Sequence, residues 1–161
     1  MHIWTLTNWQ EKYIPYDPDR RRGIRIIFDK DVDVEVRRAC KEFCKWLRKE
    51  YIFPKRVAIY IKAAETIRAR DGDLVSATIL LPIDKDAEPY MKIATGDYIK
   101  MMNSKGKDNA LAAILRTIAH ELTHYFQWLN DIEMTDMGQE RQATKYADYI
   151  LDEYAETREH P

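Results

Sequence analysis

The sequence predicts an α+β fold in which a small, mostly antiparallel sheet with one backing helix is followed by two further helices. Three observations lead to this prediction. Residues 23–81 contain several short β-branched stretches and one amphipathic helical stretch. A long segment from Asp108 to about Asn130 repeats apolar residues every three or four positions. A second helical pattern, from about Gln139 to Glu156, follows it.

The composition is that of one globular domain, which we expect over residues 1–161. Hydrophobic residues make up 45% and charged residues 33%, and the net charge is −1. A charge so close to zero gives no reason to expect a nucleic-acid or membrane partner. The chain lacks a signal-peptide pattern and an apolar run of about 18 residues, so a cytoplasmic location is expected, with secretion by an unrecognised route as the alternative. Cys40 and Cys44 are expected to be small core residues rather than metal ligands.

Residues 1–22 form an aromatic N-terminal extension that we expect to pack across the domain. Its aromatic residues are Trp4, Trp9, Tyr13 and Tyr16. Pro15 and Pro18 argue against a continuous helix there. The run 20–22 contains three arginines, which we interpret as a solvated turn rather than a nucleic-acid contact.

The next elements follow from local patterns. Residues 23–29 are predicted to form a strand, and Asp33 is predicted to cap a helix from Val34 to Tyr51. Alternating apolar residues predict a strand over 56–68, and Asp71-Gly72 predicts a hairpin turn leading to a return strand over 74–81. A short extended piece is expected over Tyr90–Thr95.

Turn and cap signals delimit the two C-terminal helices. The polar stretch 103–108 is expected to be a loop, with Asp108 or Asn109 capping the long helix. Asp136 and Gln139 resemble a capping box at the start of the last helix.

The long helical segment contains the motif His120-Glu121-Leu122-Thr123-His124, an H-E-x-x-H string. Residues four apart lie on one face of a helix, so both imidazoles can point at one zinc ion while Glu121 acts on a water beside it. Chance could also produce the match, but the helical context favours zinc. An apolar stripe supports that context: Leu111, Leu115, Ile118, Leu122, Phe126 and Leu129.

A catalytic zinc site has three protein ligands, so one more is needed. Gln127 and Asn130 stand where metzincins have glycine and histidine, which excludes that class. Glu140 is the favoured third ligand because Ala143 and Ala147 share its helix face and allow close approach. An exposed first-turn acid is the alternative interpretation of Glu140. The other acidic candidates are Asp131, Glu133, Asp136, Asp148 and Asp152.

The motif at 120–124, together with Glu140-Arg141-Gln142-Ala143-Thr144-Lys145-Tyr146-Ala147, resembles the gluzincin pattern of minigluzincins and ImmA/IrrE-type peptidases. The resemblance implies a zincin-like fold and a zinc-dependent endopeptidase with one catalytic Zn²⁺. It implies that His120, His124 and Glu140 are the zinc ligands and that Glu121 is the general base. It also implies that a polypeptide substrate binds as an added strand near Tyr90–Thr95.

The sequence departs from that pattern in ways that leave some roles open. Thr144 stands where larger gluzincins have an acid, and no residue is assigned to stabilise the oxyanion. Tyrosines are candidates for that role, although packing is the better interpretation of each: Tyr98, Tyr125, Tyr146 and Tyr149. Two alternative functions remain, a catalytically silent peptide- or partner-binding module and a zinc amidohydrolase acting on a non-peptide amide.

Overall fold

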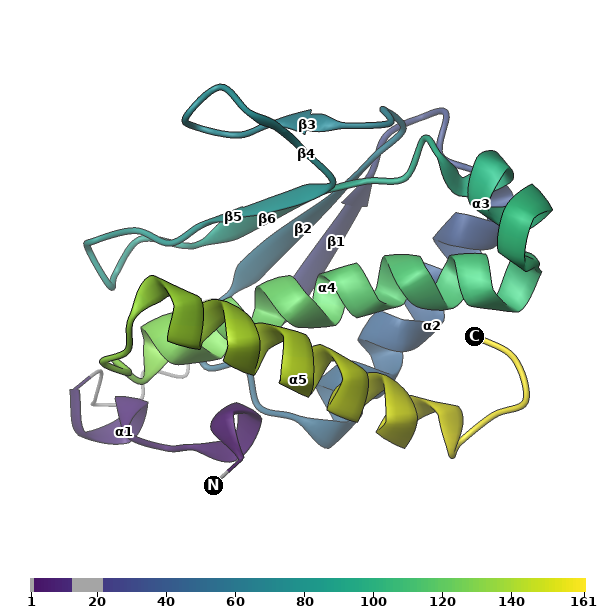
Figure 1. Cartoon of the computed structure of the whole chain (residues 1–161). Helices are drawn as coiled ribbons and strands as arrows, with labels where there is room; N and C mark the ends of the chain where they lie inside the picture. Colours follow the sequence, from purple (N-terminus) through teal and green to yellow (C-terminus); the bar gives the residue numbers. More distant parts are fainter. Residues whose placement is uncertain (1, 13–21) are drawn as a thin grey trace.

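The computed structural model describes residues 2–12 and 22–161, which form an α+β structure with a small mixed sheet (Figure 1). The strands are β1 (Ile24–Phe28), β2 (Val57–Lys62), β3 (Ile67–Arg68), β4 (Leu74–Val75), β5 (Ala77–Leu80) and β6 (Tyr90–Ala94). The helices are η1 (Ile3–Thr5), α1 (Trp9–Lys12), α2 (Val34–Glu50), α3 (Tyr98–Lys105), α4 (Lys107–Leu129) and α5 (Asp136–Ala155).

The main sheet has the strand order β1-β2-β6-β5, and two of its three pairings are parallel. The expectation of a mostly antiparallel sheet is therefore wrong. The predicted hairpin between residues 56–68 and 74–81 forms only as the short β3–β4 ladder, in which Ile67 is opposite Val75. Beyond that ladder the chain turns away, and β5 pairs antiparallel with β6 instead of with β2.

This strand order places the free edge of the sheet on a different strand from the one expected. Residues 90–94 form β6, which is hydrogen bonded to β2 on one side and to β5 on the other. The prediction that Tyr90–Thr95 is an exposed edge is wrong, because both sides of β6 are occupied. The edge strand next to α4 is β5, which within residues 2–12 and 22–161 is hydrogen bonded on one side, to β6.

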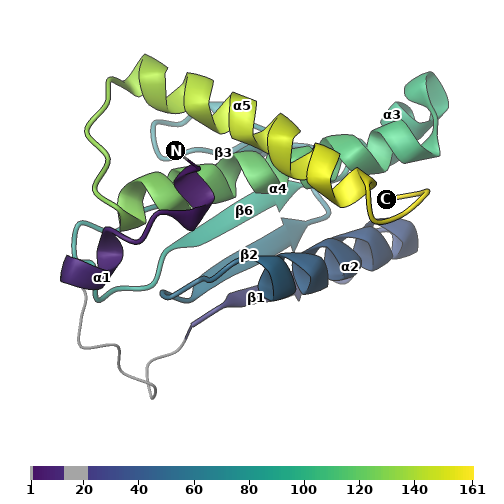
Figure 2. The same ribbon diagram turned by 90° about the horizontal axis from the view of Figure 1, so that it is seen from below.

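The helices cover one face of the sheet. Val57, Ile59 and Ile61 of β2 point into the core and are fully buried, while the residues between them are half-buried. Figure 2 shows α4 between α2 and α5 beneath the sheet. The predicted apolar stripe of α4 forms much of this core, with every member no more than 4% exposed.

The helix ends differ in part from the predictions. Asp33 caps α2 as expected, its Oδ1 accepting from the Glu35 amide at 2.8 Å. Residues 98–105 form an unpredicted helix, α3, and Gly106 with φ +88° separates it from α4, which has no side-chain cap. A positive φ favours glycine. Helix α5 starts at Asp136, three residues early, and its cap is Thr135, whose hydroxyl accepts from the Gly138 amide.

The described part of the N-terminal extension packs on α4. Trp4 is 2% and Trp9 7% exposed, and the Trp4 indole donates to the Thr123 hydroxyl at 3.0 Å. Predictions for Tyr13, Pro15, Tyr16, Pro18 and the first two arginines of the run 20–22 lie outside the described residues.

Helix α2 carries the two cysteines of the chain. Cys40 and Cys44 are free and fully buried in the core, as predicted. Burial raises the pKa of the Cys44 thiol to about 12, which keeps it protonated and unreactive.

None of the helices within residues 2–12 and 22–161 has the length and apolar character needed to cross a membrane.

Candidate metal centre

Helix α4 presents two histidines on the side opposite its core stripe. His120 and His124 lie one turn apart, and their ring centroids are 5.0 Å apart. Their side chains are 21% and 12% exposed, whereas neighbouring Leu122 is fully buried. The i, i+4 spacing on a regular helix therefore places both Nε2 atoms at one point on the surface.

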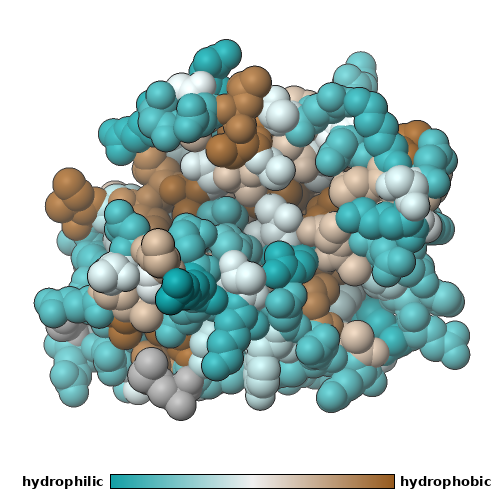
Figure 3. All heavy atoms as spheres, viewed as in Figure 1, coloured by the Kyte–Doolittle hydropathy of each residue, from teal (hydrophilic) through white to brown (hydrophobic). Residues whose placement is uncertain are grey.

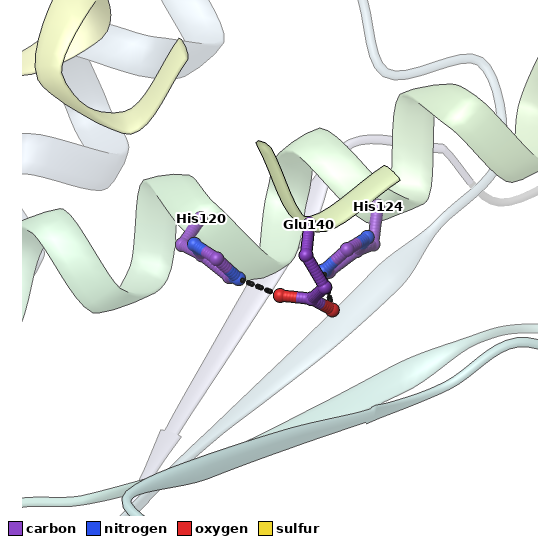
Figure 4. A group of neighbouring side chains, drawn as sticks. All are labelled: His120, His124 and Glu140. Carbon is purple, nitrogen blue, oxygen red and sulfur yellow. Dashed lines mark hydrogen bonds and ion pairs between the residues drawn. The ribbon is translucent and has the colours of Figure 1, made fainter. Parts of the chain in front are cut away.

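Helix α5 brings Glu140 to the same point. Ala143 and Ala147 are fully buried against the rest of the chain, so the two helix backbones can approach closely. Figure 4 shows the Glu140 carboxylate lying between the two imidazoles. One carboxylate oxygen is 3.1 Å from His120 Nε2, and the other is 3.1 Å from His124 Nε2.

The donor atoms fit a zinc ion. Zinc bonds to histidine nitrogen and carboxylate oxygen at about 2.0–2.2 Å, so tetrahedral ligands are roughly 3.3 Å from one another. The two nitrogen–oxygen distances of 3.1 Å are close to that value, and the ligand atoms all lie within 4.8 Å of one another. In the described part of the chain, this is the one such cluster of His, Cys, Asp or Glu side chains. The assignment of these residues as zinc ligands stays a prediction.

Gln127 holds the His124 ring. Its amide oxygen lies 2.8 Å from His124 Nδ1, and its amide nitrogen donates to Gln139 O at 3.0 Å and Gln142 Oε1 at 2.9 Å. Because the amide oxygen only accepts, this contact is satisfied when the proton is on Nδ1, which leaves Nε2, the atom that faces Glu140, as the one able to bind a cation. Sequence reasoning used Gln127 only to exclude metzincins; its position three residues after His124 was the available signal.

Glu121 lies beside this cluster in a largely dry environment. Burial, helped by the charge of Glu140, raises the pKa of the Glu121 carboxyl from 4.5 to about 7. Burial and the neighbouring His124 lower the pKa of His120, which favours its neutral, metal-binding form. A bound cation would stabilise the Glu121 carboxylate and lower its pKa again.

The other acids and histidines considered from the sequence are not part of this cluster. Asp131 pairs with Lys85 at 2.9 Å and Asp148 with Arg116 at 2.6 Å. His160 pairs with Asp108, so it does not extend the metal cluster.

The four candidate tyrosines also have other surroundings. Tyr125 is fully buried and donates to Lys55 O at 2.6 Å. Tyr146 and Tyr149 contact the His2 ring, one tilted and the other edge-on, and Tyr98 is buried at the start of α3. These contacts favour the packing interpretation of each tyrosine.

A small hollow of about 220 Å³ opens next to His124. Leu81, Trp128 and Ile132 give it apolar walls. The chain after β5 is tied to the end of α4 there, because the Trp128 indole donates to Pro82 O at 2.7 Å. These contacts fix the distance between the edge strand and the candidate metal centre.

No known family model matches the sequence, and comparison with curated proteins and with solved structures gives no match either. The motif residues and the geometry around them are therefore the guide to function.

Proposed function

We propose that this chain is a zinc-dependent metallopeptidase with a zincin-like fold, which cleaves peptide bonds within polypeptides. One observation carries the proposal. Glu140 reaches from α5 to lie 3.1 Å from both motif histidines of α4, with Glu121 beside them. A purely structural site would have no use for a half-buried carboxyl at the position of Glu121.

Each residue of the site would have a separate role in hydrolysis. His120, His124 and Glu140 would hold the ion, and Gln127 keeps His124 in the tautomer that can bind it. Zinc, when bound, polarises the scissile carbonyl and makes water a better nucleophile. Glu121 accepts the proton of the attacking water and passes it to the leaving amine.

The free edge of the sheet favours a polypeptide as the substrate. Strand β5 has backbone N–H and C=O groups on its open side, which can pair with an extended peptide. The added strand expected from the resemblance therefore belongs on β5, not on residues 90–95. The hollow beside His124, about 220 Å³, is smaller than a typical small-molecule site of about 300–1,000 Å³ and suits a single side chain.

The test combines metal analysis with peptide cleavage. Purified protein should contain one zinc per chain, and His120→Ala should lose it. The protein should cleave peptides from a random library, a chelator should stop cleavage, and added zinc should restore it. Glu121→Gln should keep zinc and lose about 10²–10⁴-fold in rate.

Glu133→Gln is the matched control, because Glu133 is an exposed acid outside the cluster and should leave the rate unchanged. Full activity in Glu121→Gln would contradict the mechanism. Zinc binding without cleavage of any peptide would instead favour the silent binding module, and cleavage of non-peptide amides alone would favour the amidohydrolase.

A further inference from the structure

A second and larger hollow lies on the sheet face that the helices leave open. Its volume is about 620 Å³, and it extends from the β3–β4 hairpin to β5 and β6. The residues that matter for its chemistry are Arg68, Arg70, Thr78, Leu81, Tyr90 and Lys92. We call it the hairpin hollow.

The hairpin hollow is positively charged. Two arginines of the hairpin and Lys92 of β6 line it, and no acidic side chain does. Arg68 donates to Gly72 O, and within residues 2–12 and 22–161 none of the three cations has a carboxylate partner. Lys62, on the neighbouring strand, is neutralised by Asp29 at 3.0 Å. The positive charge is thus uncompensated at the hollow itself.

The hairpin hollow shares one lining residue with the hollow beside His124. Leu81, just after β5, lines both of them. Figure 1 shows the β3–β4 hairpin above β5 and the helices α4 and α5 below it, and Figure 3 shows apolar and weakly polar surface between them. A peptide paired with β5 would run from one hollow to the other.

The alternation of a strand decides which side chains reach each hollow. Ile79 of β5 is opposite Met91, which points into the core, whereas Thr78 is opposite Lys92 on the open face. Successive side chains of an added strand point to the two faces in the same way. One set faces the metal centre, and the other set lies beside the three cations.

We propose that Arg68, Arg70 and Lys92 form a subsite that selects polypeptides with acidic side chains on the face of the bound strand turned away from the metal centre. The proposal rests on the proposed function, because it concerns how the polypeptide substrate of that site is selected. A polypeptide fits better than a free anion because the hollow lies along the edge strand β5 and shares Leu81 with the hollow beside His124.

The cleavage test uses a peptide that the protein cleaves. It is made in two versions, with Glu or with Gln at every second position, so that these side chains lie on the face of the bound strand turned away from the metal centre. Wild type should prefer the Glu peptide by roughly tenfold in kcat/KM, the size expected of charge-assisted hydrogen bonds. Arg68→Gln with Arg70→Gln should bring the ratio close to one. Arg68→Glu with Arg70→Glu should shift the preference to a Lys peptide. Arg25→Gln, an exposed change on β1 at the opposite edge, should keep the wild-type ratio.

A binding test makes the outcome independent of cleavage. Fluorescence anisotropy with Glu121→Gln protein should show tighter binding of the labelled Glu peptide than of the Gln peptide, and the difference should shrink in high salt. Equal cleavage and equal binding of the two peptides would overturn the subsite while leaving the metallopeptidase intact. If no peptide is cleaved, the metallopeptidase fails, and the binding ratio of the arginine variants alone decides the subsite. Binding of ATP or phosphate without discrimination between the peptides would make the hollow a free-anion site and would also overturn the proposal.

Discussion

Helix α4 has two faces that differ in almost every physical respect. The stripe of Ile118, Leu122 and Phe126 is at most 1% exposed and lies in the hydrophobic core. The opposite face presents His120 and His124 to a carboxylate that is itself 62% exposed. One face is therefore part of the core, and the other carries polar side chains at the surface. Mutations on the buried face should therefore change the free energy of unfolding, and mutations on the face with the histidines should change metal binding.

The largest expected effect is the loss of core packing. Leu122→Ala should lower the free energy of unfolding by about 2–5 kcal/mol, because it leaves a cavity on the fully buried face. His120→Ala, on the other face, should leave the metal-free protein within about 0.5 kcal/mol of wild type. Urea denaturation of metal-free protein measures both. Equal destabilisation by the two changes would show that the faces do not differ as described.

The contact between α4 and the N-terminal extension gives the next effect. Thr123→Val removes the acceptor of the buried Trp4 indole and should lower the free energy of unfolding by about 1–3 kcal/mol. Thr117→Val is the control, since the Thr117 hydroxyl is bonded to Ala113 O of its own helix. Thermal unfolding followed by tryptophan fluorescence should separate the pair; identical curves would argue against a role for the indole bond.

On the face of α4 that carries the histidines, Gln127 should affect metal binding more than folding. Gln127→Leu frees His124 Nδ1 from its partner and should weaken zinc affinity by about 10–100-fold. Gln142→Leu removes only a contact of Gln127 itself and should have a smaller effect. Competition with a chromophoric chelator gives the affinities. Unchanged affinity in Gln127→Leu would mean that the ring is oriented by packing alone.

The smallest effect concerns the seam between α4 and α5. Arg116 beside Asp148 lowers the pKa of that carboxyl below its ordinary 3.8. A lowered pKa in the folded state means that the stabilisation is complete above pH 3.8 and is lost as the pH falls through the folded-state pKa. The side chains are 41% and 60% exposed, so the pair contributes less than about 1 kcal/mol.

Asp148→Asn should therefore be slightly less stable than wild type near neutral pH, and the difference should shrink as the pH falls below 3.8. Denaturant unfolding at a series of pH values measures it. A difference that grows in acid would contradict the assigned sign.

The strand pairings show where prediction from the sequence failed. The Asp71-Gly72 turn was recognised, but it closes a ladder of two residues per strand, because the pairing of β5 with β6 takes over beyond it. Segment 98–105 is helical although part of it was expected to be a loop, and its end is set by Gly106 next to α4. Both outcomes depend on partners distant in sequence, which local patterns do not contain.

The sequence by itself determined the local geometry of the two faces of α4. Apolar residues at helical spacing and two histidines four apart fix which side is buried and on which side both imidazoles lie, because a regular helix has a fixed period. Small residues on the last helix also allowed Glu140 to be chosen among six acids. Only the tertiary structure decided that β5 is the open edge, that Gln127 is bonded to His124 and that three cations line the hairpin hollow. Those features arise from contacts between segments far apart in the chain, whose pairing is set by the packing of the whole core.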